Sequence, residues 1–567
     1  MFMILRALIS IVVFAGLFIL SFPEVIWSQS NYVINDFTFY PIPNTPRPAK
    51  GVPYIDPVFH TEIVRITDSP TETGSAWANP GYPKHDIENA DGTMLLIQSR
   101  GGSGWHIYNA NPPYNKIKDI PIALINRGVA IDARWDATDP NILYFQRYGM
   151  RRYNVLTDEC ETLHVFSEDF PPRPGELYPK FGQTLQEEGN SSDDSRYWAF
   201  NIYGQDLNPV TNKVFYYSGA IAVYDKDFYR KNNGKIISVL PKERYPNTGV
   251  DAAYPLTNPG FVSISPSGKY IWTGDRHRIF SWDFDTTKYK NLGASGHADM
   301  GFSKEGREVV VCGNRYYKGG VDLGIWVTMI DIETGEKTPL APVGDSHYHI
   351  SANGHLKPGW CVVSVYGPTA PALPTMWAQH SVYLVEMSKR VPSPDLNNHT
   401  RVWRIAHTHT KKVSYADDPF AKMNRKGTKV WFGSGWGKSY TESGGQYDVY
   451  QINLPSTWYQ DLMGNLPPTA SISATPLSGK PPLTVNFTGS GRDTDGSVVS
   501  YSWNFGDGAT SNQQTTSHTY EIPGSFTATF KVTDNKGTTG SANVTINVLK
   551  SDTTPPAPPK GLKIVSP

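Results

Sequence analysis

The stretch YSWNFGDG at residues 501–508 decides the fold of the C-terminal part of the chain. Tyr501, Trp503 and Phe505 alternate with polar residues, and side chains two residues apart lie on the same face of a β-strand. The Gly-Asp-Gly that follows is typical of a tight hairpin turn. The stretch therefore predicts a buried strand and a turn of an antiparallel β-structure, and such packing residues indicate a fold rather than a reaction.

The segment around this stretch, residues 465–549, resembles the PKD family along its whole length. The residues that carry the resemblance are Pro482, Val485, Phe487, Asp493, Asp495, Gly496, Tyr501, Trp503, Phe505, Gly506, Asp507, Gly508, His518, Tyr520, Gly524, Val532 and Asp534. The resemblance implies an immunoglobulin-like β-sandwich, an accessory module of exported and cell-surface proteins. Residues 550–567 form a Pro-rich linker that resembles the start of a truncated fibronectin type III module.

The first 30 residues have the pattern of a signal peptide. Arg6 provides the positive charge, residues 8–22 are mostly apolar, and Ser28 and Ser30 are small residues suited to a cleavage site. The apolar run is shorter than the roughly 20 residues that span a bilayer, so we expect cleavage, with an uncleaved anchor as the alternative. Residues 31–60 are then an N-terminal extension, and no membrane span is expected after cleavage.

Composition excludes some classes of function. Lys plus Arg equals Asp plus Glu at 52 each, without a long run of one sign, so no nucleic-acid partner is expected. The 50 Gly and 45 Pro favour short strands joined by turns. Cys160, Cys312 and Cys361 match neither a disulfide framework nor a zinc pattern. We expect buried thiols, with a bridge between Cys312 and Cys361 as the alternative.

Between the two ends, residues 61–458 repeat one pattern, a turn followed by an apolar strand. It occurs seven times, in ENADGTMLLIQS, RWDATDPNILYFQ, GNSSDDSRYWAFN, VSISPSGKYIWTG, FSKEGREVVVCG, ISANGHLKPGWCVVSV and KMNRKGTKVWFG. This predicts an all-β fold, a seven-bladed β-propeller followed by the sandwich. TEIVRITD at residues 61–68 is expected to add the outermost strand to the last blade and close the ring. Two separate sandwich domains are the alternative, but they leave the repetition unexplained.

Histidines and carboxylates gather at one place of this repeat, seven residues before the turn glycine or beside it on the same strand face. The residues are His85, Asp132, Arg134, His297, Asp299, His347, His349 and Asp418. His407 and His409 alternate along the last strand of the sixth blade, and the next loop brings Tyr415 toward the same rim. Imidazole and carboxylate suit a divalent metal ion, with one histidine left as a base. We expect Mn²⁺, Zn²⁺ or Ca²⁺ and no organic cofactor.

The propeller is similar to TolB-like proteins and to oligogalacturonate lyases, on residues 296–311, 345–354 and 406–435. The similarity implies a lyase in which a metal site neutralises a uronate carboxylate, a base removes the proton at C5, and the glycosidic oxygen leaves by β-elimination. It implies that His297 is the base and Arg134 the carboxylate clamp. The remaining assignments are His85 as a further catalytic residue, His347, His349, His407, His409 and Asp418 as metal ligands, and Asp132, Asp299 and Tyr415 as substrate-binding residues.

One departure leaves the metal open, because Asp417 and Asp418 stand where a further histidine pair is expected. Three functions follow from the sequence. The first is an exported polysaccharide lyase whose partner is an extracellular polysaccharide or cell-surface component. The second is a non-catalytic glycan-binding or adhesion protein, and the third a hydrolase of other substrates.

Overall fold

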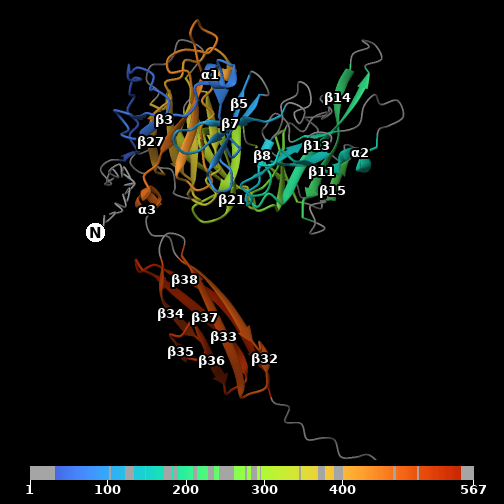
Figure 1. Cartoon of the computed structure of the whole chain (residues 1–567). Coiled ribbons are helices and arrows are strands. Elements are labelled where there is room, and N and C mark those ends of the chain that lie inside the picture. Colours follow the sequence, from blue (N-terminus) through green and yellow to red (C-terminus); the bar gives the residue numbers. More distant parts are fainter. Residues whose placement is uncertain are drawn as a thin grey trace, which may run out of the picture. The chain divides into compact units, whose positions relative to one another are not determined.

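A computed structural model describes residues 32–100, 104–121, 133–146, 149–171, 181–183, 189–207, 214–227, 235–241, 261–274, 278–281, 290–293, 295–343, 347–367, 377–388, 400–463, 468–493 and 497–550. The predicted signal peptide, the Pro-rich tail after residue 550 and Asp132 lie outside these residues. The chain divides into two compact units, Met1–Pro455 and Ser456–Pro567. Each unit is described by itself (Figure 1).

The described residues of the first unit form seven antiparallel sheets of four or five strands. In chain order, the first sheet contains β4 (Ala78–Asn79), β5 (Met94–Ser99), β6 (Trp105–Asn109) and β7 (Lys116–Asp119), and the second contains β8 (Ala133–Trp135), β9 (Ile142–Gln146), β10 (Gly149–Asn154) and β11 (Cys160–Val165). The third sheet contains β12 (Phe181–Gln183), β13 (Tyr197–Leu207), β14 (Val214–Asp225) and β15 (Lys235–Pro241). The fourth sheet contains β16 (Val262–Ile264), β17 (Tyr270–Thr273), β18 (Arg278–Ser281) and β19 (Lys290–Asn291).

The other three sheets carry most of the candidate site. The fifth sheet contains β20 (Ser295–Phe302), β21 (Glu308–Lys318), β22 (Val321–Asp331) and β23 (Lys337–Pro342). The sixth sheet contains β24 (Tyr348–Ser351), β25 (Trp360–Val365), β26 (Ser381–Glu386), β27 (Val402–His407) and β1 (Val33–Ile34). The seventh sheet contains β28 (Lys422–Met423), β29 (Lys429–Ser434), β30 (Asp448–Asn453), β3 (Glu62–Arg65) and β2 (Pro53–Ile55). Four strands that follow one another in the sequence pair in the first two of these sheets and three in the last, as the repeated turn-and-strand pattern predicts, and strands from the N-terminal part complete the last two sheets.

Large aromatic side chains fill the space between neighbouring sheets. Trp105 and Trp135 lie in the core between the first and second sheets, Trp198 between the second and third, and Trp272 between the fourth and fifth. Trp431 lies in a core shared by the seventh sheet and the first. Because one sheet face must be covered by another, this packing produces a propeller-like fold. The all-β prediction is confirmed, while the count of seven blades for the whole ring stays a prediction.

The N-terminal extension takes part in two sheets. β1 pairs with β27, and β3 pairs with β30, so chain segments from opposite ends meet in the seventh sheet. Residues 61–68 were predicted to form the outermost strand of the last blade. They do contain β3 of the seventh sheet, but β2 pairs with β3 and is the outermost strand instead. An edge strand exposes unpaired backbone groups, and the short β2 covers that edge.

The described residues contain only a few short helices. They are α1 (Ser69–Thr73), α2 (Phe166–Asp169), the 3-10 helix η5 (Tyr415–Asp417) and α3 (Trp458–Met463). Within the described part of the chain no helix has the length and apolar character needed to cross a membrane. No disulfide joins the cysteines: Cys312 and Cys361 are buried thiols, whereas Cys160 is exposed, unlike the expectation for it.

The second unit is a two-sheet sandwich. One sheet contains β31 (Thr469–Thr475), β33 (Leu483–Arg492) and β36 (Thr515–Tyr520), and the other contains β32 (Ser478–Gly479), β38 (Thr539–Val548), β37 (Gly524–Asp534), β34 (Val498–Asn504) and β35 (Thr510–Ser511). Trp503 and Phe505 are buried against Phe487 and Phe530, as the alternation in the sequence predicted. The Tyr520 hydroxyl donates to the Phe505 carbonyl at 3.0 Å and fixes the end of the strand.

Candidate functional site

Two histidines from neighbouring sheets meet at the centre of the candidate site. His297 on β20 and His349 on β24 have ring centroids 4.1 Å apart. The Tyr82 hydroxyl lies 3.1 Å from Nδ1 of His297, and Oδ2 of Asp418 lies 3.2 Å from Nε2 of His349. The fold thus gathers four polar side chains from distant parts of the chain, three of which were predicted site residues.

The protonation states at this pair follow from burial and from two lysines. Burial, with the positive charges of Lys412 and Lys84, holds the pKa of His349 well below its usual value, so the ring is neutral at pH 7. Burial also raises the pKa of Asp418 to about 6, against the opposing ion pair with Lys412. At pH 7 most Asp418 is therefore ionised. Because a carboxylate only accepts, His349 then donates Nε2–H to it, and Nδ1 carries the lone pair.

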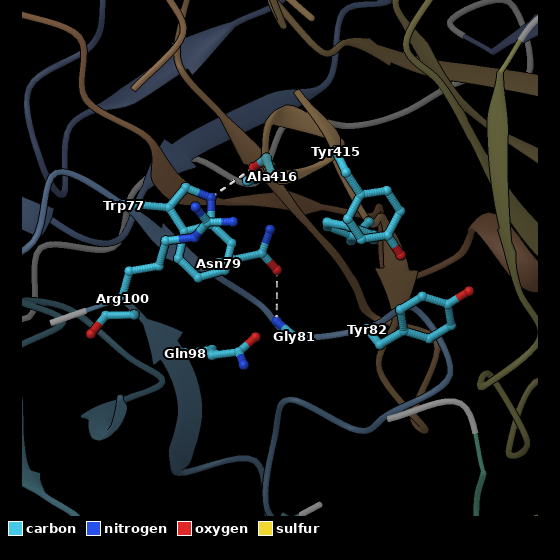
Figure 2. A pocket seen from close by; sticks show the side chains of 10 residues that line it. Trp77, Asn79, Gly81, Tyr82, Gln98, Arg100, Tyr415 and Ala416 are labelled. Atoms are coloured by element: carbon cyan, nitrogen blue, oxygen red, sulfur yellow. Dashed lines mark hydrogen bonds between the residues drawn. The ribbon is translucent and has the colours of Figure 1, made fainter. Parts of the chain in front are cut away.

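A cavity of about 390 Å³ has Tyr82, the neighbour of His297, in its lining (Figure 2). Four aromatic side chains line it, Trp77, Tyr82, Tyr415 and Phe420, together with the polar side chains Asn79, Gln98, Ser99 and Arg100. The Trp77 indole N–H donates to the Ala416 carbonyl at 2.7 Å, which fixes the ring. Tyr82, Tyr415 and Phe420 also contact the His349 ring, with centroids 5.9, 6.2 and 4.6 Å away. The cavity and the histidine pair are therefore one site.

Arg100 is the charged member of this lining. Its guanidinium carbon lies 5.2 Å from the centroid of Trp77 and 5.0 Å from that of Tyr440, and Nη1 donates to the Tyr440 hydroxyl. No carboxylate of the described residues forms an ion pair with it. Two aromatic rings thus position an exposed cation at an aromatic cavity, and its charge is available to an anionic ligand.

Several predicted residues lie nearby with structural contacts of their own. The Arg134 guanidinium is buried and donates to the carbonyls of Ala133 at 3.0 Å and Gly189 at 2.6 Å, so it braces the backbone rather than facing the cavity. Asp299 accepts from the backbone N–H groups of Met300 and Ala352, and burial raises its pKa to about 6. His85 is buried, with its ring 6.4 Å from Tyr82. Asp132 lies outside the described residues.

Of the predicted metal ligands, His349 and Asp418 are neighbours, but no third ligand among the described residues completes a site with them. His407 pairs through Nδ1 with Oδ2 of Asp56 at 3.0 Å, and His409 stacks on Trp436 with centroids 3.8 Å apart. His347 is exposed, whereas His349 is buried. Among the residues that the structure describes, no three His, Cys, Asp or Glu side chains gather closely enough to hold a metal ion. The metal ion thus stays a prediction.

Four residues of the site were missed in the sequence: Tyr82, Arg100, Trp77 and Lys412. Tyr82 lies only three residues before His85, in the loop that opens the first sheet, but it is neither seven residues before the turn glycine nor a neighbour on the same strand face. Trp77 comes directly before β4, and Arg100 comes directly after β5. The number of residues between two such positions depends on the loop that joins the strands, so no sequence spacing identifies them as cavity residues. The one available signal was the cluster of aromatic residues between residues 77 and 82.

Residues 465–548 match the family model described as PKD domain. A microbial collagenase from Vibrio alginolyticus is 36% identical over 100 residues, which are 18% of this chain and 12% of the collagenase, and the similarity is confined to the PKD domain. The chain spans about an eighth of that relative's length.

Two solved structures are similar to parts of the chain. An oligogalacturonate lyase from Vibrio parahaemolyticus is 11% identical with a TM-score of 0.45, covering 72% of this chain and all of that one. The PKD1 domain of the Vibrio cholerae metalloprotease PrtV is 34% identical with a TM-score of 0.13, covering 15% of this chain and 98% of that one. From the family model and the sandwich of the second unit it follows that residues 465–548 are a PKD domain.

Proposed function

We propose that the first unit binds an acidic polysaccharide in the cavity at Trp77 and cleaves it by β-elimination, with His297 as the base. One observation supports this most: Arg100 lines the same cavity as Tyr82, and the Tyr82 hydroxyl contacts the base candidate His297. Aromatic faces suit the apolar faces of sugar rings, and a guanidinium suits a carboxylate. A polymer of uronic acids offers both groups.

The proposed reaction uses the neighbours of His297. The base takes the proton from C5, the electrons of that C–H bond form the C4–C5 double bond, and the glycosidic oxygen leaves C4 with the electrons of the broken bond. That oxygen then gains a proton from water or from the His297 imidazolium. His349 is neutral and does not repel this imidazolium, and the nearby Asp418 carboxylate interacts favourably with it. Arg100 replaces Arg134 as the proposed partner of the substrate carboxylate.

A divalent metal ion stays part of the proposal without a step of its own. His349 Nδ1 is buried and has no hydrogen-bond partner among the described residues, so it is a nitrogen of this cluster suited to a ligand bond. A single such nitrogen does not make a site, and the chemistry above is carried by the chain's own residues. Elemental analysis of the purified full chain measures whether an ion is bound.

We further propose that the protein is exported and that the PKD domain is an accessory module near the substrate or the cell surface. Its sandwich offers packing and turn residues rather than a catalytic group, which supports a binding or spacing role. A non-catalytic glycan-binding protein is the second candidate, because the aromatic cavity with Arg100 suits binding by itself. The two candidates differ in whether His297 is needed for product formation.

Removing the charge of Arg100 is expected to weaken binding of acidic sugars. Titration calorimetry of Arg100→Gln with tetragalacturonate should show an affinity about ten- to a hundredfold lower than that of the natural chain, the usual loss for one hydrogen bond to a charged group. Arg315→Gln is the matched control, because Arg315 pairs with Asp322 outside the cavity and should leave the affinity unchanged. Equal binding of a neutral glucan tetrasaccharide, or an unaltered affinity of Arg100→Gln, would contradict the proposal.

A further inference from the structure

A second cavity, of about 490 Å³, also has a neighbour of His349 in its lining. Its lining includes Tyr366, His380, His409, Lys411, Lys412 and Trp436, and residues 42–45 of the N-terminal extension form part of its wall. Tyr366 contacts the His349 ring, with centroids 5.4 Å apart, and Lys412 pairs with Asp418. The linings of both cavities therefore touch His349.

Two imidazole nitrogens of this lining are buried without a hydrogen-bond partner among the described residues, Nε2 of His409 and Nδ1 of His380. Only 3% of His409 is exposed. Burial lowers the pKa of His409 to about 4 and lowers that of His380, so both rings are neutral at pH 7. Buried polar atoms are almost always hydrogen-bonded, and unsatisfied ones that line a cavity indicate a missing partner. Neutral imidazole nitrogens pair well with hydroxyl groups.

The charged side chains in the described lining of the second cavity are both lysines. Lys411 and Lys412 line it, and no Asp or Glu belongs to its described lining. The carboxylates that pair with these lysines, Glu442 and Asp418, lie outside that lining. A ligand that carries both hydroxyl groups and a carboxylate would satisfy the imidazoles and the ammonium groups together.

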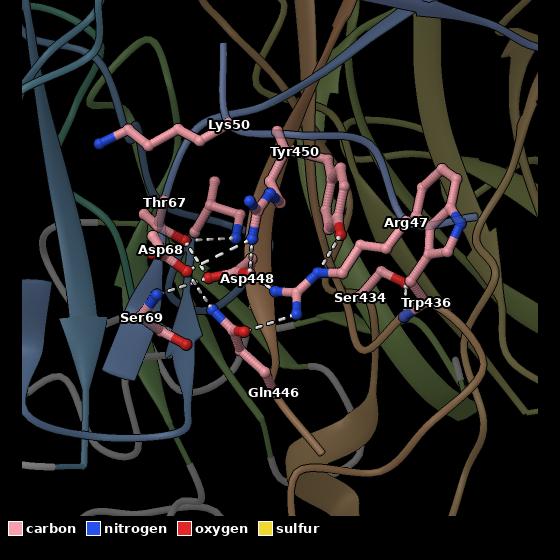
Figure 3. Close-up of polar contacts among 12 residues, drawn as sticks. Arg47, Lys50, Thr67, Asp68, Ser69, Ser434, Trp436, Gln446, Asp448 and Tyr450 are labelled. Atoms are coloured by element: carbon pink, nitrogen blue, oxygen red, sulfur yellow. Dashed lines mark hydrogen bonds and ion pairs between the residues drawn. The ribbon is translucent and has the colours of Figure 1, made fainter. Parts of the chain in front are cut away.

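The wall formed by residues 42–45 is held in place by the propeller. The Trp436 indole N–H donates to the Thr45 carbonyl at 3.1 Å. Two residues further on, Arg47 donates to the Gln446 side chain at 2.6 Å and to the Tyr450 hydroxyl at 3.3 Å, and it pairs with Asp448 (Figure 3). The wall is thus a fixed part of the cavity.

We propose that this second cavity is a binding site for another acidic sugar of the same polysaccharide chain, whose neighbouring sugars occupy the cavity at Trp77. The inference rests on the proposed function and specifies its substrate as a polymer that extends across His349 into both cavities. The second site recognises hydroxyl groups through His380 and His409 and a carboxylate through Lys411 and Lys412. A short oligomer fills one cavity, and a longer one fills both.

The test compares binding of two probes to the full chain by titration calorimetry, digalacturonate and tetragalacturonate. The natural chain is expected to bind the longer probe at least about tenfold more tightly. Lys411→Gln, at an exposed position, and His409→Phe, which keeps the ring on Trp436, should each remove most of that preference while leaving the affinity for digalacturonate unchanged. Lys337→Gln, which replaces an exposed lysine on β23, is the control and should preserve the preference.

Two results would overturn the inference: a natural chain without the length preference, or variants that weaken both probes equally or neither. His409→Phe also changes a stacked ring and could fail to give a folded protein. In that case the result with Lys411→Gln decides the test. The readout is binding, so it separates this inference from the proposed reaction. A length preference without any product refutes the reaction alone, and product without a length preference refutes the second site alone.

Discussion

Replacement of His297 by alanine is expected to lower the rate of β-elimination by about 10²- to 10⁴-fold, the usual contribution of a positioned general base. The ring lies against His349 and is oriented by the Tyr82 hydroxyl, and its loss removes the group that takes the C5 proton. Affinity for tetragalacturonate should change much less, because Arg100 and the aromatic rings remain. Initial rates followed by product absorbance near 230 nm, beside calorimetric affinities, give both quantities.

Two further variants make this result specific. Tyr82→Phe keeps the aromatic ring of the cavity and removes the hydroxyl, so its rate should lie between those of the natural chain and His297→Ala. His164→Ala on β11 is the control, because that ring pairs with Asp169 away from the cavity. A folded His297→Ala protein with the full rate would show that another group is the base.

Replacement of Asp448 by asparagine is expected to lower the free energy of unfolding of the first unit by about 3–5 kcal/mol, the usual effect of removing one partner of a buried ion pair. The carboxylate is fully buried and accepts from Thr67 at 2.7 Å and from the Ser69 N–H at 2.8 Å. It also pairs with Arg47 and, at 3.2 Å, with Arg65. Without it Arg47 loses its carboxylate partner, and Arg65 keeps only Asp68, at 3.5 Å.

Denaturant unfolding, with the transition of the first unit separated from that of the PKD domain, measures this effect. Asp322→Asn is the control, because Asp322 forms an exposed pair with Arg315, and such pairs contribute little. A transition as stable as that of the natural chain would contradict the role given to Asp448. Since Arg47 follows the wall of the second cavity, Asp448→Asn should also reduce the preference for tetragalacturonate.

Local patterns predicted much of the fold. The alternation of Tyr501, Trp503 and Phe505 is a property of one strand, and residues 61–68 contain a strand that pairs with β30. The strands of the N-terminal extension were not predicted, because β1 and β2 have only two and three residues and depend on the edges they join. Such pairing is decided by distant parts of the chain and leaves little periodicity in a short segment.

The prediction of two histidine pairs assumed that both histidines of each pair lie in one strand, but each of these strands includes only one of them. The β27 strand ends at His407, and His409 has a φ of 50°, so the two rings do not share a strand face. The β24 strand begins at Tyr348, which leaves His347 outside it. By contrast, His297 and His349 were identified because both lie within strands, β20 and β24, that are neighbours in space. One of the carbonyl partners of Arg134, that of Gly189, comes from a distant segment, which no local pattern reveals.

The most direct test of the proposed function is to incubate the full chain with polygalacturonate and follow absorbance near 230 nm. The unsaturated sugar ends that β-elimination creates absorb there, so a steady rise is expected with the natural chain and a rise at least about 10²-fold slower with His297→Ala. No rise with polygalacturonate or with other uronate polymers, from a folded protein that binds them, would contradict the assigned reaction and leave the cavity as a binding site.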